Sequence, residues 1–157
     1  IYDNIALGNP NVTRARAIEA AKTVNADDFI SALPEGYDSA LTERGQNLSQ
    51  GQRQLLAFAR VLAADPEILV LDEATANIDT ETELLIQDAL ERLTQGRTSI
   101  IIAHRLQTIQ EADRVLVLDQ GQVAEIGNHE ELLAAEGLYA TLHALQFQSE
   151  ERAEESQ

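Results

Sequence analysis

Two adjacent carboxylates, Asp72 and Glu73, follow a run of four apolar residues from Ile68 to Leu71. Carboxylates at the end of a buried strand are costly unless a cation or hydrogen bonds compensate them. Mg²⁺ suits this role, because it takes one or two carboxylates and leaves other positions for phosphate oxygens. We therefore expect Asp72 to bind Mg²⁺ and Glu73 to act as general base toward an attacking water. The same residues also fit a strand end whose solvated acids open a loop.

A second candidate site lies at the start of a predicted helix, in the segment Leu48-Ser49-Gln50-Gly51-Gln52. A serine and a glycine in a first helical turn expose backbone N–H groups, and the helix dipole favours an anion there. Gly51 also removes a side chain that would hinder the approach of a phosphate. The alternative is that Ser49 and Gln52 form an ordinary capping box that binds nothing.

The remaining polar candidates are single residues. His104 follows the apolar run that ends at Ala103, and it fits either a structural histidine or a contact to a transferred phosphate. Asp79 fits the acid at a helix N-terminus. We assign no chemistry to His129 or His143, and Glu43-Arg44 fits a solvated turn.

The elements that must position these residues alternate between helices and strands after Asn47. Before it, the pattern predicts two short helices, at 13–24 and 27–33. A capped helix runs from Ser49 to just before Asp65, and another begins at Thr80, capped with Glu83, and stops at Gly96. Two strands, at 68–71 and 99–103, are predicted to be buried on both faces. A hairpin of 115–118 and 123–126 turns at Gln120-Gly121. A helix then begins at Asn128, capped with Glu131, and a last helix is predicted at 138–147. This order favours an α/β fold with a largely parallel sheet, whose ligand site lies beyond the carboxyl ends of the strands.

Composition excludes several classes of function. The 157 residues suit a single domain, with 44% apolar residues and 4% aromatic residues. Eleven basic against 27 acidic residues leave a formal charge of −16, which disfavours non-specific binding to nucleic acid and to anionic lipid. The absence of cysteine removes disulfides, thiolate zinc sites and a cysteine nucleophile. No apolar run reaches the length of a membrane span.

Four segments of the chain, in their order and spacing, resemble the ATP-binding domain of ABC transporters. In that family the segments correspond to the signature motif, the Walker B strand with its catalytic glutamate, the D-loop and the switch histidine. They are Leu48 to Gln54, Ile68 to Glu73, Ala74 to Asp79, and Ile102 to Arg105. Each match alone is weak, whereas four in this order are specific.

The resemblance covers the chain from Ile1 to about Leu145. The opening from Ile1 to Gly8 and the turn from Thr42 to Gly45 resemble the exporter branch, in which that turn faces the transmembrane partner. One departure is Gln50, which stands where the signature motif usually has glycine. Ser49 and Gly51 are in place, so we expect this change to be tolerated.

The resemblance implies a P-loop NTPase-like ABC ATPase domain, an α/β fold with a mostly parallel sheet flanked by helices and an α-helical signature subdomain. It divides the chain into a helical subdomain at 1–64, an ATPase core at 65–147 and an acidic disordered tail at 148–157. The sequence contains neither methionine nor a GxxxxGK[ST] loop. We therefore expect an incomplete domain, taken from a longer chain, that is inactive in isolation.

The resemblance also implies a function: part of the ATP-binding and hydrolysing domain of an exporter, which couples ATP hydrolysis to transport. ATP and Mg²⁺ are the implied cofactors. The implied site comprises the catalytic residues Glu73 and His104, the metal ligand Asp72, and the nucleotide contacts Ser49, Gly51, Gln52 and Asp79. The implied partners are a second ATP-binding domain in a head-to-tail homodimer or heterodimer, and a transmembrane domain fused upstream. We expect no nucleic acid partner, and a location on the cytoplasmic face of a bacterial inner membrane.

Three alternatives remain open on the sequence. Soluble ATPases of DNA repair and chromosome maintenance share the signature and Walker B pattern, although the charge of −16 and the exporter-like opening weigh against them. An importer ATPase usually lacks the Thr-Glu-Arg-Gly type of turn. A non-catalytic interaction fragment, completed by another chain, would leave an exposed sheet edge that invites pairing.

Overall fold

The computed structural model describes residues 1–42, 45–72, 79–103 and 106–145. These residues form two compact units, Ile1–Ile101 and Ile102–Gln157, which are considered separately below. Within the described ranges, no helix combines the length and the apolar character that a membrane span needs. The predicted acidic tail at 148–157 lies outside the described residues.

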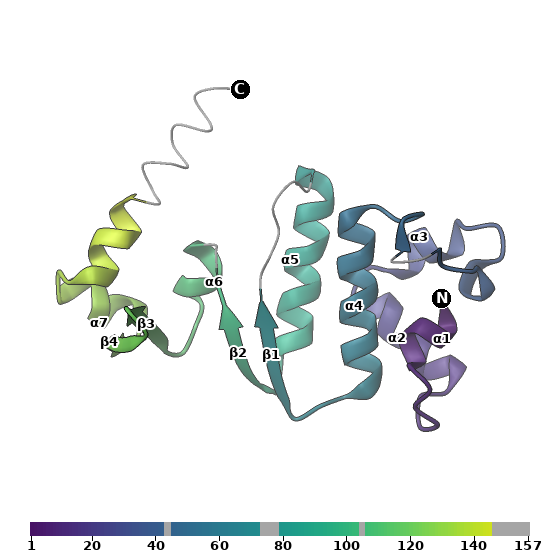
Figure 1. Ribbon diagram of the computed structural model, residues 1–157, viewed down its shortest axis with the longest axis horizontal. Coiled ribbons are helices and arrows are strands. Elements are labelled where there is room, and N and C mark those ends of the chain that lie inside the picture. The colour runs from purple at the N-terminus through teal and green to yellow at the C-terminus, as the bar shows by residue number, and fades with distance from the viewer. Residues whose placement is uncertain (43–44, 73–78, 104–105, 146–157) are drawn as a thin grey trace. The chain divides into compact units, whose positions relative to one another are not determined.

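The first unit begins with small helices, and the first two of them pack on one long helix, α4 (Gln50–Ala64) (Figure 1). The small helices are α1 (Tyr2–Ala6), α2 (Arg14–Thr23), α3 (Asp27–Ser31) and the 3₁₀ turn η1 (Gly36–Asp38). The helix α2 begins where predicted, because the Thr13 side chain accepts a hydrogen bond from the Arg16 N–H. Both predicted helices in this region are confirmed, with α3 ending at Ser31 rather than Leu33.

The helix α4 (Gln50–Ala64) is amphipathic and forms the centre of the core of this unit. Its buried face packs against α1, α2 and the following helix, α5 (Thr80–Thr94), and carries Leu55, Leu56, Phe58, Ala59 and Ala63. The predicted end before Asp65 is confirmed: Asp65 takes the left-handed conformation, with φ 52°, and stops the helix.

The chain then forms strand β1 (Ile68–Asp72), helix α5 (Thr80–Thr94) and strand β2 (Thr98–Ile102). The two strands are hydrogen-bonded neighbours, and Figure 1 draws their arrows in the same direction, as the predicted parallel arrangement requires. On one face of the pair, Leu69 is buried in the same core as Ile86 and Leu93 of α5.

The prediction that both strands are buried on both faces is wrong for the described part of the chain. Ile68 is 62% exposed, Val70 70% and Ile100 57%. Side chains alternate between the faces of a strand, so α4 and α5 cover one face, and no described element of this unit covers the other.

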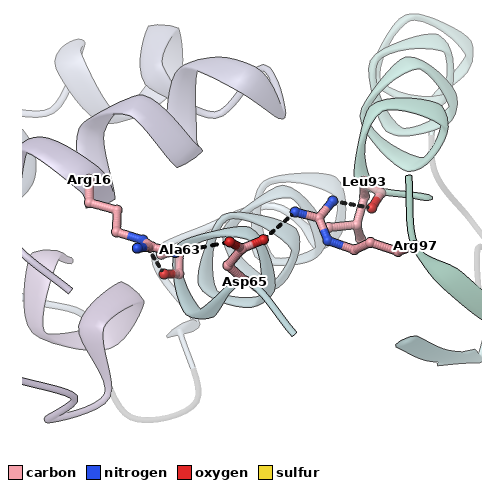
Figure 2. A network of polar contacts seen from close by, with 5 residues as sticks. All are labelled: Arg16, Ala63, Asp65, Leu93 and Arg97. Carbon is pink, nitrogen blue, oxygen red and sulfur yellow. Dashed lines mark hydrogen bonds and ion pairs between the residues drawn. The ribbon is translucent and has the colours of Figure 1, made fainter. Parts of the chain in front are cut away.

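Three segments meet at Asp65, the residue that ends α4 (Figure 2). Its carboxylate lies 2.7 Å from a guanidinium nitrogen of Arg97 and 3.5 Å from one of Arg16. Arg97 also donates to the Leu93 carbonyl at the end of α5, and Arg16 of α2 donates to the Ala63 carbonyl of α4. The pKa of Asp65 lies below its usual range, chiefly because of the hydrogen bond from Arg97. These contacts fix the junction between α4 and β1.

The second unit contains α6 (Leu106–Gln110), β3 (Val115–Asp119), β4 (Gln122–Gly127) and α7 (His129–Ala134), followed by helical residues 138–145. The strands β3 and β4 form the predicted antiparallel hairpin. Gln120 and Gly121 both have positive φ, 47° and 78°, which is typical of a tight hairpin turn. The Asn128–Glu131 capping box of α7 is confirmed.

Glu125 connects this hairpin to the helix at 138–145. Its two carboxylate oxygens accept hydrogen bonds from the backbone N–H groups of Leu138 and Tyr139, at 2.7 and 3.0 Å. The acid therefore satisfies two of the N–H groups that a helix start leaves without an intrahelical acceptor. A Cβ atom on Gly137 would lie 2.0 Å from the Glu125 Oε1 atom, so a side chain at this position would displace the carboxylate.

Candidate functional site

The predicted phosphate-binding turn is the first turn of α4. Ser49 has extended backbone angles, and its Oγ accepts a hydrogen bond from the Gln52 N–H at 3.1 Å. The Gln52 side-chain oxygen accepts one from the Ser49 N–H at 3.0 Å, which completes the predicted capping box.

This cap leaves donors available at the positive end of the helix dipole. The N–H groups of Gln50 and Gly51 have no acceptor within the helix, because they lie in its first turn. The Ser49 hydroxyl accepts from Gln52 through a lone pair, so its own proton remains available for donation. The exposed Ser49 hydroxyl and the N–H group of the exposed Gln50 are donors of the kind that bind a phosphate, and the N–H group of the buried Gly51 lies in the same turn. The capping alternative is thus correct as local structure, and it is compatible with anion binding.

A residue that the sequence did not single out supports this turn. The Arg53 guanidinium donates to the carbonyl oxygen of Leu48 at 2.6 Å and to that of Gly45 at 3.4 Å. The only signal in the sequence was a basic side chain near a helix N-terminus, where a cation is electrostatically unfavourable.

Asp72 ends β1 with an exposed side chain and lines a small hollow. The hollow lies among α4, α5, β1 and β2, and its lining residues include Asp72, Gln54 and Gln87. Carboxylate and carboxamide oxygens are donors that suit a hard cation such as Mg²⁺. In the described ranges, no three potential metal-ligating acids or imidazoles cluster together. An ion at Asp72 would therefore need oxygen ligands from water and phosphate.

Asp79 is the N-cap of α5. The predicted cap at Thr80 is therefore wrong by one residue. Its Oδ1 atom accepts a hydrogen bond from the Thr82 N–H at 2.9 Å. Hydrogen bonding with Thr82 lowers the pKa of Asp79 below its usual value. Aspartate and threonine are both good cap residues, and Asp79 takes the position because its extended backbone precedes the first helical residue.

The structure brings three of these features toward one end of the first unit. Figure 1 shows the start of α4, the carboxyl end of β1 and the start of α5 all directed toward the upper end of that unit. Ser49, Gly51 and Gln52 share one turn, whereas Asp72 and Asp79 lie on two other elements. The predicted catalytic residues Glu73 and His104, as well as the Glu43-Arg44 turn, lie outside the described residues.

Comparisons with known proteins identify the class of this α/β fold. Residues 2–76 match the family described as ABC transporter. In overall fold the chain is similar to a bacterial Atm1-family ABC exporter with ATP bound, with a TM-score of 0.80 and 48% identity. The match covers 92% of this chain and 25% of the exporter chain. The fold is therefore that of an ABC ATPase, a member of the P-loop NTPase class.

Curated relatives agree with this classification. The chain is 55% identical over 147 residues to the uncharacterized ABC transporter ATP-binding protein YknV of Bacillus subtilis, covering 94% of this chain and 24% of the relative. It is 53% identical over 151 residues to an ATP-dependent lipid A-core flippase of Chromohalobacter salexigens, covering 96% and 26%. The chain thus spans about a quarter of the length of these relatives.

The chain belongs to the ABC transporter family and corresponds to part of the ATP-binding domain found in its exporters. The predicted fold and resemblance are confirmed. The alternative of a DNA-maintenance ATPase is not supported, because these similar proteins are transporters or transporter ATP-binding proteins.

Proposed function

We propose that this chain is part of the ATP-binding and hydrolysing domain of an ABC exporter, which couples ATP hydrolysis to the movement of a substrate across a membrane. The observation that carries the proposal is the first turn of α4, where the Ser49 hydroxyl and the N–H groups of Gln50 and Gly51 offer a phosphate site. The similarity to an ATP-bound exporter supports it.

In this proposal the α4 turn serves a nucleotide held by a second ATP-binding domain. Ser49 and Gly51 donate hydrogen bonds to the γ-phosphate of an ATP bound by the partner's P-loop, in a head-to-tail homodimer or heterodimer. Gln52 keeps Ser49 in place through the capping box, and Asp79 contacts the nucleotide while it caps α5. Binding of two ATP molecules closes this dimer, and hydrolysis releases it.

The residues at the strand ends serve the nucleotide on their own side. Asp72, the exposed last residue of β1, would bind Mg²⁺ through its carboxylate. When bound, Mg²⁺ neutralises charge on the phosphate oxygens. Glu73 accepts a proton from the attacking water, and His104 donates a hydrogen bond to the γ-phosphate. The main contribution of the protein to hydrolysis is positioning and charge stabilisation.

The location and the remaining partners follow from the same proposal. The domain works at the cytoplasmic face of a membrane, in a bacterium the inner membrane, beside a transmembrane domain carried upstream in the same subunit. The 157-residue chain alone does not hydrolyse ATP, because its sequence contains no GxxxxGK[ST] loop to hold the phosphates.

The substitution Glu73→Gln in the complete protein tests the proposed activity. Glutamine has nearly the same shape but cannot accept the proton, so we expect hydrolysis of Mg²⁺-ATP to fall by about 10²- to 10⁴-fold. Binding of trinitrophenyl-ATP should stay unchanged. Glu67→Gln, a change of the same type before β1, is the control. Turnover at the normal rate in Glu73→Gln would exclude Glu73 as the base, and a wild-type protein without ATPase activity would refute the proposed function.

A further inference from the structure

Residues 45–48 form a turn directly before Ser49, the proposed phosphate-binding residue. The Gly45 N–H donates to the Thr42 carbonyl at 2.8 Å, and the Leu48 N–H donates to the Gly45 carbonyl at 3.0 Å. Gly45 has φ +64°, a backbone conformation that residues other than glycine rarely adopt. Leu48 is buried, whereas the next residue, Ser49, is exposed.

Arg53 connects this turn to the helix. Its guanidinium donates to the Leu48 carbonyl at 2.6 Å and to the Gly45 carbonyl at 3.4 Å. Its aliphatic stem lies against Gly45, where an added Cβ atom would be 3.4 Å from the Arg53 Cδ atom. A cation in the first turns of a helix opposes the helix dipole, and these two carbonyls compensate the charge.

The peptide group between Leu48 and Ser49 is consequently held on both sides by α4. Arg53 holds its carbonyl oxygen, and the side-chain oxygen of Gln52 holds its N–H at 3.0 Å. Because a peptide group is planar, two contacts on opposite edges restrict the rotation of the whole group. That plane sets the direction in which the Ser49 side chain leaves the backbone.

We propose that Arg53 is a positioning residue for ATP hydrolysis: it fixes the Leu48–Ser49 peptide so that the Ser49 hydroxyl and the first N–H groups of α4 point at the γ-phosphate. This inference rests on the proposed function, because it assigns the bound anion as ATP. Arg53 acts through Ser49 and does not itself contact the nucleotide. Its contribution therefore belongs to turnover rather than to the affinity of the P-loop for ATP.

The test uses Arg53→Ala and Arg53→Lys in the complete protein, with kcat and KM for Mg²⁺-ATP as readouts. Misplacing the Ser49 turn should lower kcat of Arg53→Ala by about 10- to 100-fold, with KM unchanged within about twofold. Lysine reaches one carbonyl but lacks the fork of the guanidinium, so Arg53→Lys should retain an intermediate kcat. Arg92→Ala removes an exposed arginine whose ion pair with Asp88 lies within α5, and it serves as the matched control.

A double-substitution cycle separates positioning from general stabilisation. If Arg53 acts through Ser49, then Arg53→Ala should cause little further loss in a protein that already carries Ser49→Ala. The inference would be overturned if the kcat of the double variant fell by the product of the two single fold-losses. It would also be overturned if the kcat of Arg53→Ala equalled that of the wild type. If Arg53→Ala does not fold, the kcat of Arg53→Lys decides: a value equal to that of Arg92→Ala overturns the inference. A wild-type protein without ATPase activity would instead refute the proposed function.

Discussion

At the residue scale, Ser49 caps α4 and, in the proposed function, also binds a phosphate, and the two roles use different parts of its hydroxyl group. A lone pair of Oγ accepts the Gln52 N–H and starts the helix, while the hydroxyl proton remains available for a phosphate. A capping box and an anion site are thus compatible in one residue. The neighbouring Gln50, which replaces the usual glycine of the signature motif, is exposed and leaves the cap intact.

The substitution Ser49→Arg tests the proposed head-to-tail arrangement. A bulky cation at this turn should block the approach of the partner's nucleotide and lower hydrolysis by about 10²- to 10³-fold, the usual loss when a group that stabilises transferred charge is removed. Binding of trinitrophenyl-ATP to each P-loop should be unaffected, because in this arrangement Ser49 contacts only the nucleotide held by the partner.

The exposed Ser31 at the end of α3 provides the control substitution Ser31→Arg, which adds the same side chain to another helix end. If Ser49→Arg weakened nucleotide binding as much as it weakened turnover, Ser49 would contact the nucleotide of its own domain. The head-to-tail proposal would then be wrong.

At the element scale, α4 is the structural link between the two halves of the candidate site. Its first turn carries the proposed phosphate donors, and its end leads through Asp65 into β1, the strand that carries Asp72. The contacts of Asp65 with Arg16 and Arg97 join this junction to α2 and to the turn after α5. The site therefore depends on how firmly α4 is held at both ends.

The substitution Asp65→Asn tests the junction through its pH dependence. Arg97 and Arg16 hold the pKa of Asp65 below its usual value in the folded protein. The stabilisation is therefore complete above the unfolded pKa of about 3.9 and is lost as the pH falls through the folded pKa. Asparagine tolerates the left-handed conformation of residue 65, so the variant removes the charge and leaves the backbone unstrained.

We expect faster hydrogen exchange in the last two turns of α4 in Asp65→Asn at neutral pH. After correction for intrinsic exchange rates, the difference from the wild type should disappear below the folded pKa of Asp65. Asp28→Asn, at an exposed position of α3, controls for the loss of one negative charge. A difference that persists at the acid end would assign the effect to packing rather than to the ion pairs.

The elements that could be predicted from the sequence are those determined by neighbours in the chain. The capping box of α4 and the turn at Gln120-Gly121 depend on residues within one turn of each other, and both are confirmed. The cap of α5 was misplaced by one residue, because Asp79 and Thr80 have similar capping chemistry. The role of Arg53 could not be predicted from its position near a helix start alone, because the backbone carbonyls that it binds do not depend on residue type.

At the scale of the whole molecule, the strand surfaces show what an apolar pattern cannot determine. The apolar runs in β1 and β2 correctly predicted strands, but a run of this kind does not say which element covers each face. The described part of the first unit covers only the face that packs on α4 and α5. Ile68, Val70 and Ile100 on the other face are more than half exposed.

This exposed face predicts self-association of the isolated 157-residue chain. Contiguous apolar patches on a soluble protein favour association, and the formal charge of −16 opposes it only at low ionic strength. The double substitution Val70→Thr with Ile100→Thr should weaken association about 10-fold, because it removes roughly 1–2 kcal/mol of apolar burial. Sedimentation velocity in about 0.15 M salt measures the change.

The control for this prediction is Leu84→Thr on α5. Leu84 is 62% exposed, close to the exposed fraction of Ile68, but it lies outside the strand surface. If the strand face drives association, Leu84→Thr should leave the association constant unchanged. If Leu84→Thr weakens association as much as the double substitution, or if the wild-type chain stays monomeric at every concentration, the strand face is not the associating surface. The exposed apolar side chains of the strand face would then remain solvated in the isolated chain.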